Sequence, residues 1–250
     1  MRSGNPALGE STFKNLPALG ASGTMTISGT VNKTFLLLLL VALAAGFTWN
    51  HLGTPDAYGF IPGLGTWVTV PSIAGFVLAL VIIFKKTTAP YLAPAYAVLE
   101  GIAIGAISLA MEVQFPGIVI QAVGLTFGTL FCLLAAYRSG VIRATENFKL
   151  GVFAATGAVA LYYIVAMVLS FFGFTAPLIH DSGMWGILFS AAVVVIAALN
   201  LVLDFDFIEQ GEAAGAPKYM EWYGGFGLVV TLVWLYLEIL RLLAKTRSRD

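Results

Sequence analysis

The chain has 250 residues, of which 59% are hydrophobic and 10% are charged, and its formal net charge is zero. Soluble domains average about 45–50% apolar and about 25% charged residues, so this composition argues against a soluble enzyme and against a disordered protein. Without an excess of Lys and Arg, the chain also lacks the basic surface of a nucleic-acid-binding protein. The single cysteine, Cys132, excludes an intramolecular disulfide framework and a zinc site built on cysteines.

The first 32 residues are polar and rich in Gly, Ser, Thr and Asn, which predicts a flexible N-terminal tail over 1–32. A signal peptide is the alternative, because the Ala-Leu-Ala run at 42–44 resembles a cleavage site, but so long a polar lead argues against it. From 33 to 244, apolar runs alternate with short polar breaks. We therefore predict one membrane domain over 33–244 and a short basic tail over 245–250.

Seven apolar runs are long enough to cross a membrane, since a bilayer core about 30 Å thick needs about 20 helical residues. They lie near 33–49, 68–84, 91–111, 118–138, 151–172, 184–207 and 222–244. The breaks between them contain the Pro, Gly and charged residues that are typical of loops. The predicted fold class is an all-α membrane protein with a bundle of seven transmembrane helices.

The Lys and Arg residues of the short loops predict the orientation, because such residues collect on the cytoplasmic side. They precede the first predicted helix or follow the second, fourth and sixth: Arg2, Lys14, Lys33, Lys85, Lys86, Arg138, Arg143, Lys149 and Lys218. This predicts a cytoplasmic N-terminus. Seven crossings then place the basic C-terminal end outside, against the rule. Either the last helix crosses nevertheless, which we favour, or it is re-entrant and returns the tail to the cytoplasm.

Acidic residues inside the apolar runs are the best functional candidates, because each costs about 2.5–3.5 kcal/mol at mid-bilayer. The first, Glu100, borders a stripe of small residues that suits close helix packing. The stripe consists of Ala93, Ala97, Gly101, Gly105 and Ser108. Glu100 is predicted to face the bundle, where it either lines a path or locks the third helix to a neighbour by a hydrogen bond.

The sixth helix carries Asp204 and Asp206. Residues spaced by four and three predict one buried face, made up of Gly186, Ser190, Val193, Ala197, Asn200, Asp204 and Phe207. Asp206 lies about 200° from Asp204 around the helix, so Asp204 is the better interior candidate. Asp206 and Glu209 predict an acidic mouth at the cytoplasmic end. Alternatively, both Asp residues simply end the helix among the lipid headgroups.

The seventh helix carries Glu238 on a similar face, formed by Gly224, Gly227, Thr231, Trp234, Glu238 and Arg241. In one interpretation Glu238 lines a path; in the other it is neutralised by Arg241, three residues further on. Two carboxylates brought together in a low dielectric cannot both ionise cheaply, so a buried Asp–Glu pair predicts a cation site, a proton switch, or both. Periodicity alone does not prove that the two acids meet.

Catalytic chemistry is not expected, because the chain contains neither GxSxG nor HExxH, and no catalytic residue is predicted. His51 and His180 fall in predicted outer loops, where we expect them to be solvated.

At these acidic residues the chain resembles the Bax inhibitor family, also called the transmembrane Bax inhibitor motif family, and looks like a bacterial member. The similarity is strongest at residues 97–101 (AVLEG), at the Asp-bearing end of the sixth helix, and at 234–238 (WLYLE). The resemblance implies a seventh helix at the centre of the other six. It also implies a pH-sensitive calcium leak channel, a multi-pass protein of the bacterial inner membrane.

In this family an acidic pair between helices 6 and 7 controls the path. By resemblance the pair is Glu238 with Asp204 or Asp206; the spacing to the Glu-Gln-Gly run at 209–211 favours Asp204. Asp204 and Glu238 are then the predicted ligands of Ca²⁺, which is the transported or bound ion, and no other cofactor is expected. Glu100, Asn200 and Arg241 are additional residues of the path or of the packing.

The chain departs from the family pattern in three ways. Glu238 stands where Asp is usual, Asp206 adds an acid, and the second helix lacks the Arg with which some bacterial relatives hold the helix 6 Asp. The alternative function is a non-transporting membrane regulator that binds a membrane protease or another membrane complex. A secondary transporter is a third hypothesis, disfavoured by the odd number of spans. The predicted partners are the lipid bilayer and, for a regulator, a membrane protein, with no nucleic acid.

Overall fold

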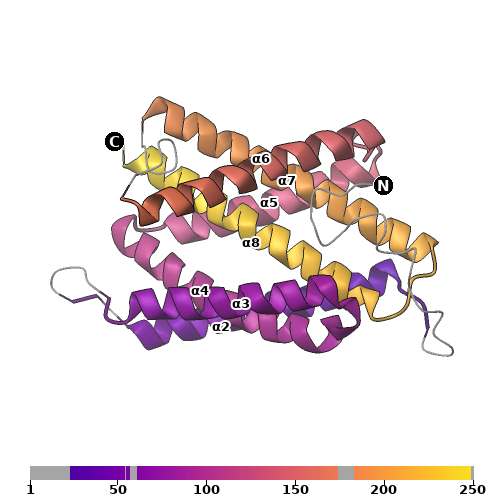
Figure 1. The fold of residues 1–250 in the computed structure, drawn as a ribbon, viewed down its shortest axis with the longest axis horizontal. Helices are drawn as coiled ribbons and strands as arrows, with labels where there is room; N and C mark the ends of the chain where they lie inside the picture. Colours follow the sequence, from indigo (N-terminus) through magenta and orange to yellow (C-terminus); the bar gives the residue numbers. More distant parts are fainter. Residues whose placement is uncertain (1–22, 54, 57–60, 174–182, 249–250) are drawn as a thin grey trace. The chain divides into compact units, whose positions relative to one another are not determined.

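A computed structural model of the chain describes residues 23–53, 55–56, 61–173 and 183–248 (Figure 1). These residues form seven α-helices and one short 3₁₀ turn, η1, at Lys86–Thr88. The α-helices are α2 (Ile27–Leu52), α3 (Leu64–Phe84), α4 (Ala89–Gln114), α5 (Ile118–Arg138), α6 (Glu146–Phe171), α7 (Met184–Ala213) and α8 (Met220–Arg247). Within this described part there is no strand, and the only β contact is an isolated bridge between Thr24 and Pro217.

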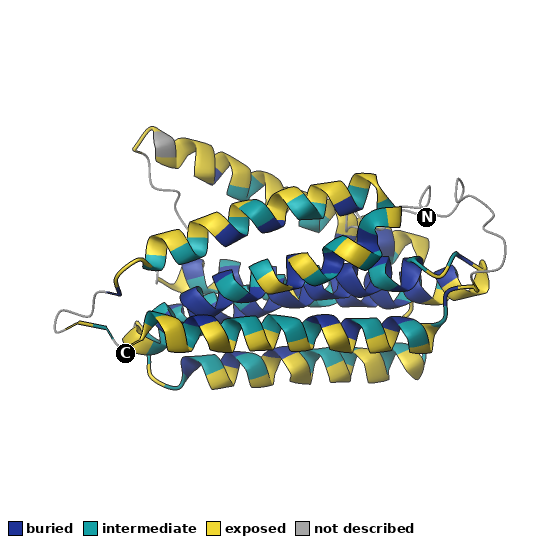
Figure 2. Cartoon of the chain, turned by 90° about the horizontal axis from the view of Figure 1, so that it is seen from below, coloured by how far each residue is buried: buried dark blue, intermediate teal, exposed yellow. Residues whose placement is uncertain are grey.

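All seven helices are long and apolar enough to cross a membrane. The shortest have 21 residues, or about 31 Å of helix, which matches a hydrocarbon core of about 30 Å. Exposed residues run along several helices beside buried ones (Figure 2), and many of the exposed side chains are large and apolar. Lipid tails would cover such faces. The predicted fold class, an all-α multi-pass membrane protein, is confirmed.

The helix bounds differ most from the sequence prediction at three helices. The helix α6 begins at Glu146 rather than near residue 151, and α7 continues to Ala213 rather than ending near residue 207. Both ends of α2 differ as well. This helix begins at Ile27 rather than near residue 33, so residues 27–32, which we predicted to be tail, are helical. It also continues to Leu52, which places His51 in its last turn. The His51 ring stacks on Phe47, 5.6 Å away, instead of standing in a loop.

Other parts of the sequence prediction fall outside the described residues. These parts are residues 1–22 of the tail, His180, and residues 249–250 at the C-terminus. The division of the chain into tail, membrane domain and basic tail therefore stays a prediction.

The chain divides into two compact units, which we describe separately. The first, here called the α6 unit, contains α6, nearly all of α5, α7 up to Phe207 and α8 from Val230. The second, the α4 unit, contains α2, α3, α4, the end of α7 from Ile208 and the start of α8 up to Val229.

In the α4 unit, α4 packs against both α2 and α3. The small-residue stripe predicted on this helix is buried along its whole length. Gly101 lies directly against the backbone of Val41 in α2, and a methyl group on Gly105 would come within 2.5 Å of the Ala45 carbonyl oxygen. The predicted close packing of α4 is confirmed, and α2 is its partner.

The face that periodicity predicted on α7 is buried, and of the face predicted on α8 all but Trp234 and Arg241, which are half-buried, are buried. Every member of the predicted α7 face, from Gly186 to Phe207, is buried. The most apolar stretch of α8 is 67% buried, the largest share among the seven helices. A position of α8 at the centre of all six others stays a prediction.

Candidate functional site

Glu238 lies in the second half of α8 and is buried, with only 2% of its surface exposed. One turn further along the same helix, Arg241 directs its guanidinium back at this carboxylate. Arg241 Nη1 donates to Glu238 Oε1 at 2.8 Å and to Oε2 at 2.9 Å. The Arg241 side chain is 38% exposed, so the pair joins a buried acid to a partly exposed base. This is the contact expected in the second of the two interpretations of Glu238, in which Arg241 neutralises it.

Tyr163 of α6 completes this arrangement. Its hydroxyl donates to Glu238 Oε1 at 2.9 Å and accepts from Arg241 Nη1 at 2.7 Å. The Arg241 guanidinium also lies 5.3 Å from the centre of the Tyr163 ring, within the range of a cation–π contact. Tyr163, Glu238 and Arg241 therefore form a closed hydrogen-bonded group, which we call the Glu238 triad.

Asp204 and Asp206 of α7 have different surroundings, as periodicity predicted. Asp204 is completely buried. The Asp206 side chain is 20% exposed, and its Oδ2 lies 2.9 Å from the Nζ of Lys149 at the start of α6. Lys149 itself is buried, with 6% of its side chain exposed. Asp206 is thus paired with a lysine, and the acidic mouth of Asp206 and Glu209 stays a prediction.

Asn200 connects α7 to α6. Its side-chain amide nitrogen donates to Thr156 Oγ1 at 2.8 Å and to the Ile196 carbonyl of its own helix, also at 2.8 Å. Asn200 is 2% exposed, so both bonds satisfy a polar group away from lipid. The predicted inward face of α7 therefore carries a real interhelical polar contact.

Glu100 belongs to the α4 unit. It is half-buried, and its carboxylate is hydrogen-bonded to Tyr96, one turn earlier in α4. On the other side, a methyl group on Gly75 of α3 would lie 3.4 Å from Glu100 Oε2. These contacts favour the interpretation in which Glu100 takes part in the packing of α4 with α3. A role for Glu100 in a path stays a prediction.

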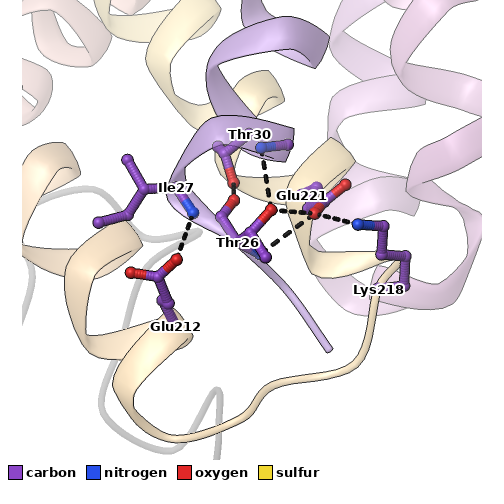
Figure 3. A network of polar contacts seen from close by, with 7 residues as sticks. Thr26, Ile27, Thr30, Glu212, Lys218 and Glu221 are labelled. Atoms are coloured by element: carbon purple, nitrogen blue, oxygen red, sulfur yellow. Dashed lines mark hydrogen bonds and ion pairs between the residues drawn. The ribbon is translucent and has the colours of Figure 1, made fainter. Parts of the chain in front are cut away.

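Sequence reasoning missed a second buried acid, Glu221, in the first turn of α8. Figure 3 shows its carboxylate at the start of α2, where it accepts from Thr26 N at 3.1 Å and from Thr26 Oγ1 at 2.9 Å. Lys218 Nζ lies 2.7 Å from the same oxygen. Glu212 accepts from the Ile27 amide at 2.9 Å. We call these five residues the Thr26 clasp.

The clasp explains why α2 begins in a polar segment. The first N–H groups of a helix have no partner within the helix and need acceptors from elsewhere. Here Thr26 Oγ1 accepts from Gly29 N, while the two carboxylates take up the amides of Thr26 and Ile27. Gly29 leaves room for Glu221, because a methyl group at that position would overlap the carboxylate.

The chemistry of the α6 unit is that of charged side chains in an apolar surrounding. Carboxylate oxygens are the hard ligands that Ca²⁺ prefers. Among the described residues, no group of three or more His, Cys, Asp and Glu side chains is placed to hold a metal ion. The pairing of Glu238 with Asp204, or with Asp206, stays a prediction, as does their binding of Ca²⁺.

Tyr163, Thr156 and Lys149 all come from α6, and sequence reasoning gave none of them a role in the site. The available signal was their spacing of seven residues, from Lys149 just before the apolar run at 151–172 to Thr156 and Tyr163 within it. A search for acids alone does not detect it.

Comparison with known proteins gave one match. A family model described as Bax inhibitor 1 like matches residues 5–248, a range that includes all seven helices. No curated protein matched the chain, and no solved structure did.

Proposed function

The chain belongs to the Bax inhibitor 1 like family, and from this premise we propose that it is a pH-sensitive leak channel for Ca²⁺. In this proposal the path is gated by a buried acidic pair, Glu238 of α8 with Asp204 of α7. Asp206 is the alternative partner on α7.

The observation that carries the proposal is the burial of Glu238 in a helix long and apolar enough to span a membrane. An ionisable group at such a depth is expensive, and in membrane proteins it commonly marks an ion or proton pathway. Asp204 is likewise completely buried, in a second such helix. Two buried acids in neighbouring segments of the chain support a cation path better than they support a purely structural role.

The Glu238 triad suggests how such a gate works. Arg241 Nη1 occupies both oxygens of Glu238, so Ca²⁺ reaches this carboxylate only when the guanidinium moves away. The side chain of Arg241 is partly exposed and is therefore free to swing outward. Protonation of the acidic pair removes the negative charge that holds either cation, and this couples the flux to pH.

The test is Ca²⁺ entry into liposomes that contain the purified protein, measured from pH 6 to pH 8. Glu238→Gln replaces the acid by a group that is uncharged at every pH. We expect the variant to hold one flux across the range. Asp204→Asn should flatten the pH profile in the same way, because it removes the other half of the pair.

Glu212→Gln is the matched control. It makes the same change on an exposed side chain of α7, and its amide oxygen can still accept from Ile27 N. Its pH profile should follow that of the wild type. A profile unchanged in both Glu238→Gln and Asp204→Asn would refute the gate. If the folded wild type gave no flux at all, the alternative would be favoured, a regulator that binds a membrane protease or another membrane complex.

A further inference from the structure

One face of the helix α6 is buried or half-buried, and half of the residues in a stripe along this face are polar. Six of its buried or half-buried positions recur at spacings of three and four, which keeps these six on one helix face, and Phe148, Ala155 and Tyr162 beside them are half-buried. Within that stripe, apolar and polar residues take turns: Lys149, Val152, Thr156, Val159, Tyr163 and Ala166. Most of the remaining described positions of α6 are exposed. The polar residues are every second member of this stripe, at intervals of seven residues over two heptads.

Each polar residue of this stripe meets a polar group of another helix. Lys149 Nζ lies 2.9 Å from Asp206 Oδ2, and Thr156 Oγ1 accepts from Asn200 Nδ2 at 2.8 Å. Tyr163 donates to Glu238 Oε1 at 2.9 Å. All of these residues belong to the α6 unit. From Lys149 to Tyr163 the line extends about 21 Å along the helix, which is most of the thickness of a bilayer core.

We propose that this line of Lys149, Thr156 and Tyr163, here called the α6 seam, forms one wall of the ion path. Lys149 and Arg241 block the two ends of this path, because each occupies a carboxylate that a passing cation would need. We call these two residues the plugs. The inference rests on the proposed cation leak and goes beyond the acidic gate, because it assigns path positions to a helix that carries no acid within the seam.

Lys149 and Arg241 compete with an incoming cation for the carboxylates of Asp206 and Glu238. An ammonium group 2.9 Å from Asp206 Oδ2 occupies the place from which a cation would approach that oxygen. Arg241 does the same at Glu238, at the other end of the seam. Between the two ends, the Thr156–Asn200 pair offers neutral oxygen ligands, which is the chemistry that a partly dehydrated Ca²⁺ accepts. The seam is thus closed by the protein's own cations at both ends.

The competing explanation is that the seam only holds helices together. Interhelical hydrogen bonds in membranes are common, and each contributes little to stability on average. The two explanations differ in whether water reaches Thr156. A purely adhesive seam is dry, whereas a path must admit water and ions at least part of the time.

The experiment uses the reactivity of a cysteine toward a charged, membrane-impermeant thiol reagent. The native Cys132 is first replaced by Ser, and Thr156→Cys is then compared with Ala158→Cys in the reconstituted full-length protein. Ala158 is exposed on α6, on nearly the opposite side and at nearly the same depth. Because the reacting form is the hydrated thiolate, Thr156→Cys should react about tenfold faster than Ala158→Cys.

A second comparison tests Lys149 as a plug. Lys149→Gln should speed labelling of Thr156→Cys and raise the Ca²⁺ flux about tenfold, whereas labelling of Ala158→Cys, which lies outside the seam, should stay unchanged. Equal labelling of the two cysteines, with and without Lys149→Gln, in protein that is monodisperse and folded, would overturn the seam.

The labelling result does not depend on Ca²⁺, so the two proposals fail separately. A labelled seam without Ca²⁺ flux would keep the path and reject the calcium leak. Ca²⁺ flux with an unlabelled seam would keep the leak and place its path elsewhere.

Discussion

At Gly101, a single added methyl group would meet the backbone of a neighbouring helix. The Cβ of an alanine there would lie 2.8 Å from the Cβ of Ala44 and closer still to the Val41 carbonyl oxygen. Backbone cannot yield as a flexible side chain does. We therefore expect Gly101→Ala to destabilise the protein by about 1–3 kcal/mol, a cost typical of an overpacked core. Thermal unfolding in detergent, followed by circular dichroism, measures the effect.

Gly46→Ala is the control for this prediction. It lies on α2, the partner helix, and a methyl group there would meet no atom within 4 Å. The change from Gly to Ala inside a helix is then favourable by about 0.5–1 kcal/mol. The melting temperatures of the two variants should move in opposite directions. A Gly101→Ala protein as stable as Gly46→Ala would mean that α2 and α4 are not in close contact.

The same residues show how far sequence reasoning reaches at this scale. Glu238 and Arg241 are three apart in one helix, so periodicity could predict their pairing. Tyr163 lies 75 residues before Glu238, and nothing local in the sequence indicates that its hydroxyl meets that carboxylate. Burial could be predicted for Asp204 because it depends on the helix face, but the Lys149 partner of Asp206 depends on how two helices pack.

At the scale of whole helices, the start of α2 depends on the Thr26 clasp. Glu221→Gln removes the ion pair with Lys218. It also replaces the carboxylate that accepts from Thr26 N by a neutral amide, which is a weaker acceptor. Hydrogen bonds to charged groups contribute about 1.5–3 kcal/mol, so we expect the first turn of α2 to fray. Hydrogen exchange followed by mass spectrometry should show faster exchange in peptides covering residues 26–33, with the centre of α2 unchanged.

The control is again Glu212→Gln, which lies in the same clasp but is exposed and keeps an acceptor for Ile27 N. Its exchange over residues 26–33 should stay within error of the wild type. If Glu221→Gln exchanged no faster there than Glu212→Gln, the clasp would not be what fixes the start of the helix.

The presence of each helix could be predicted from the length of its apolar run. The residues at which a helix begins and ends could be predicted only where the signal lies nearby in the sequence. The bounds of α5 match the prediction, and Gly117, with φ of 80°, marks the break before it. The start of α2 was missed because its acceptor Glu221 lies 195 residues from Thr26. The inward faces of α7 and α8 followed from spacing alone. The half-polar face of α6 has the same spacing, but its polar residues are mostly uncharged and attract less notice.

For the whole molecule, the unsettled question is the side of the membrane on which the C-terminus lies. The positive-inside rule concerns charges in loops and disfavoured a full crossing, because the C-terminal end is basic. Two of those charges are not loop charges. Arg241 is engaged with Glu238, and Lys245 is buried with its Nζ 3.1 Å from the Gly186 carbonyl. Their placement weakens the objection to seven crossings.

The length and continuity of α8 argue in the same direction. A re-entrant segment must reverse direction within the membrane, yet α8 is one helix of 28 residues, or about 42 Å, which exceeds a core of about 30 Å. We therefore predict that the C-terminus lies on the side opposite the loop between α3 and α4. Single cysteines at Ser248 and at Thr87 in that loop, both exposed, would be labelled with an impermeant thiol reagent after Cys132→Ser.

In sealed vesicles of one known orientation, only one of these two cysteines should react, and the other should react after the vesicles are opened. Inverting the vesicles should exchange the two results, which controls for intrinsic reactivity. Labelling of both positions from the same side would show that α8 does not complete a crossing. In that case Arg241 and Lys245 would return to the same side as the other loop cations, and the Glu238 triad would sit on a helix that enters and leaves by one face.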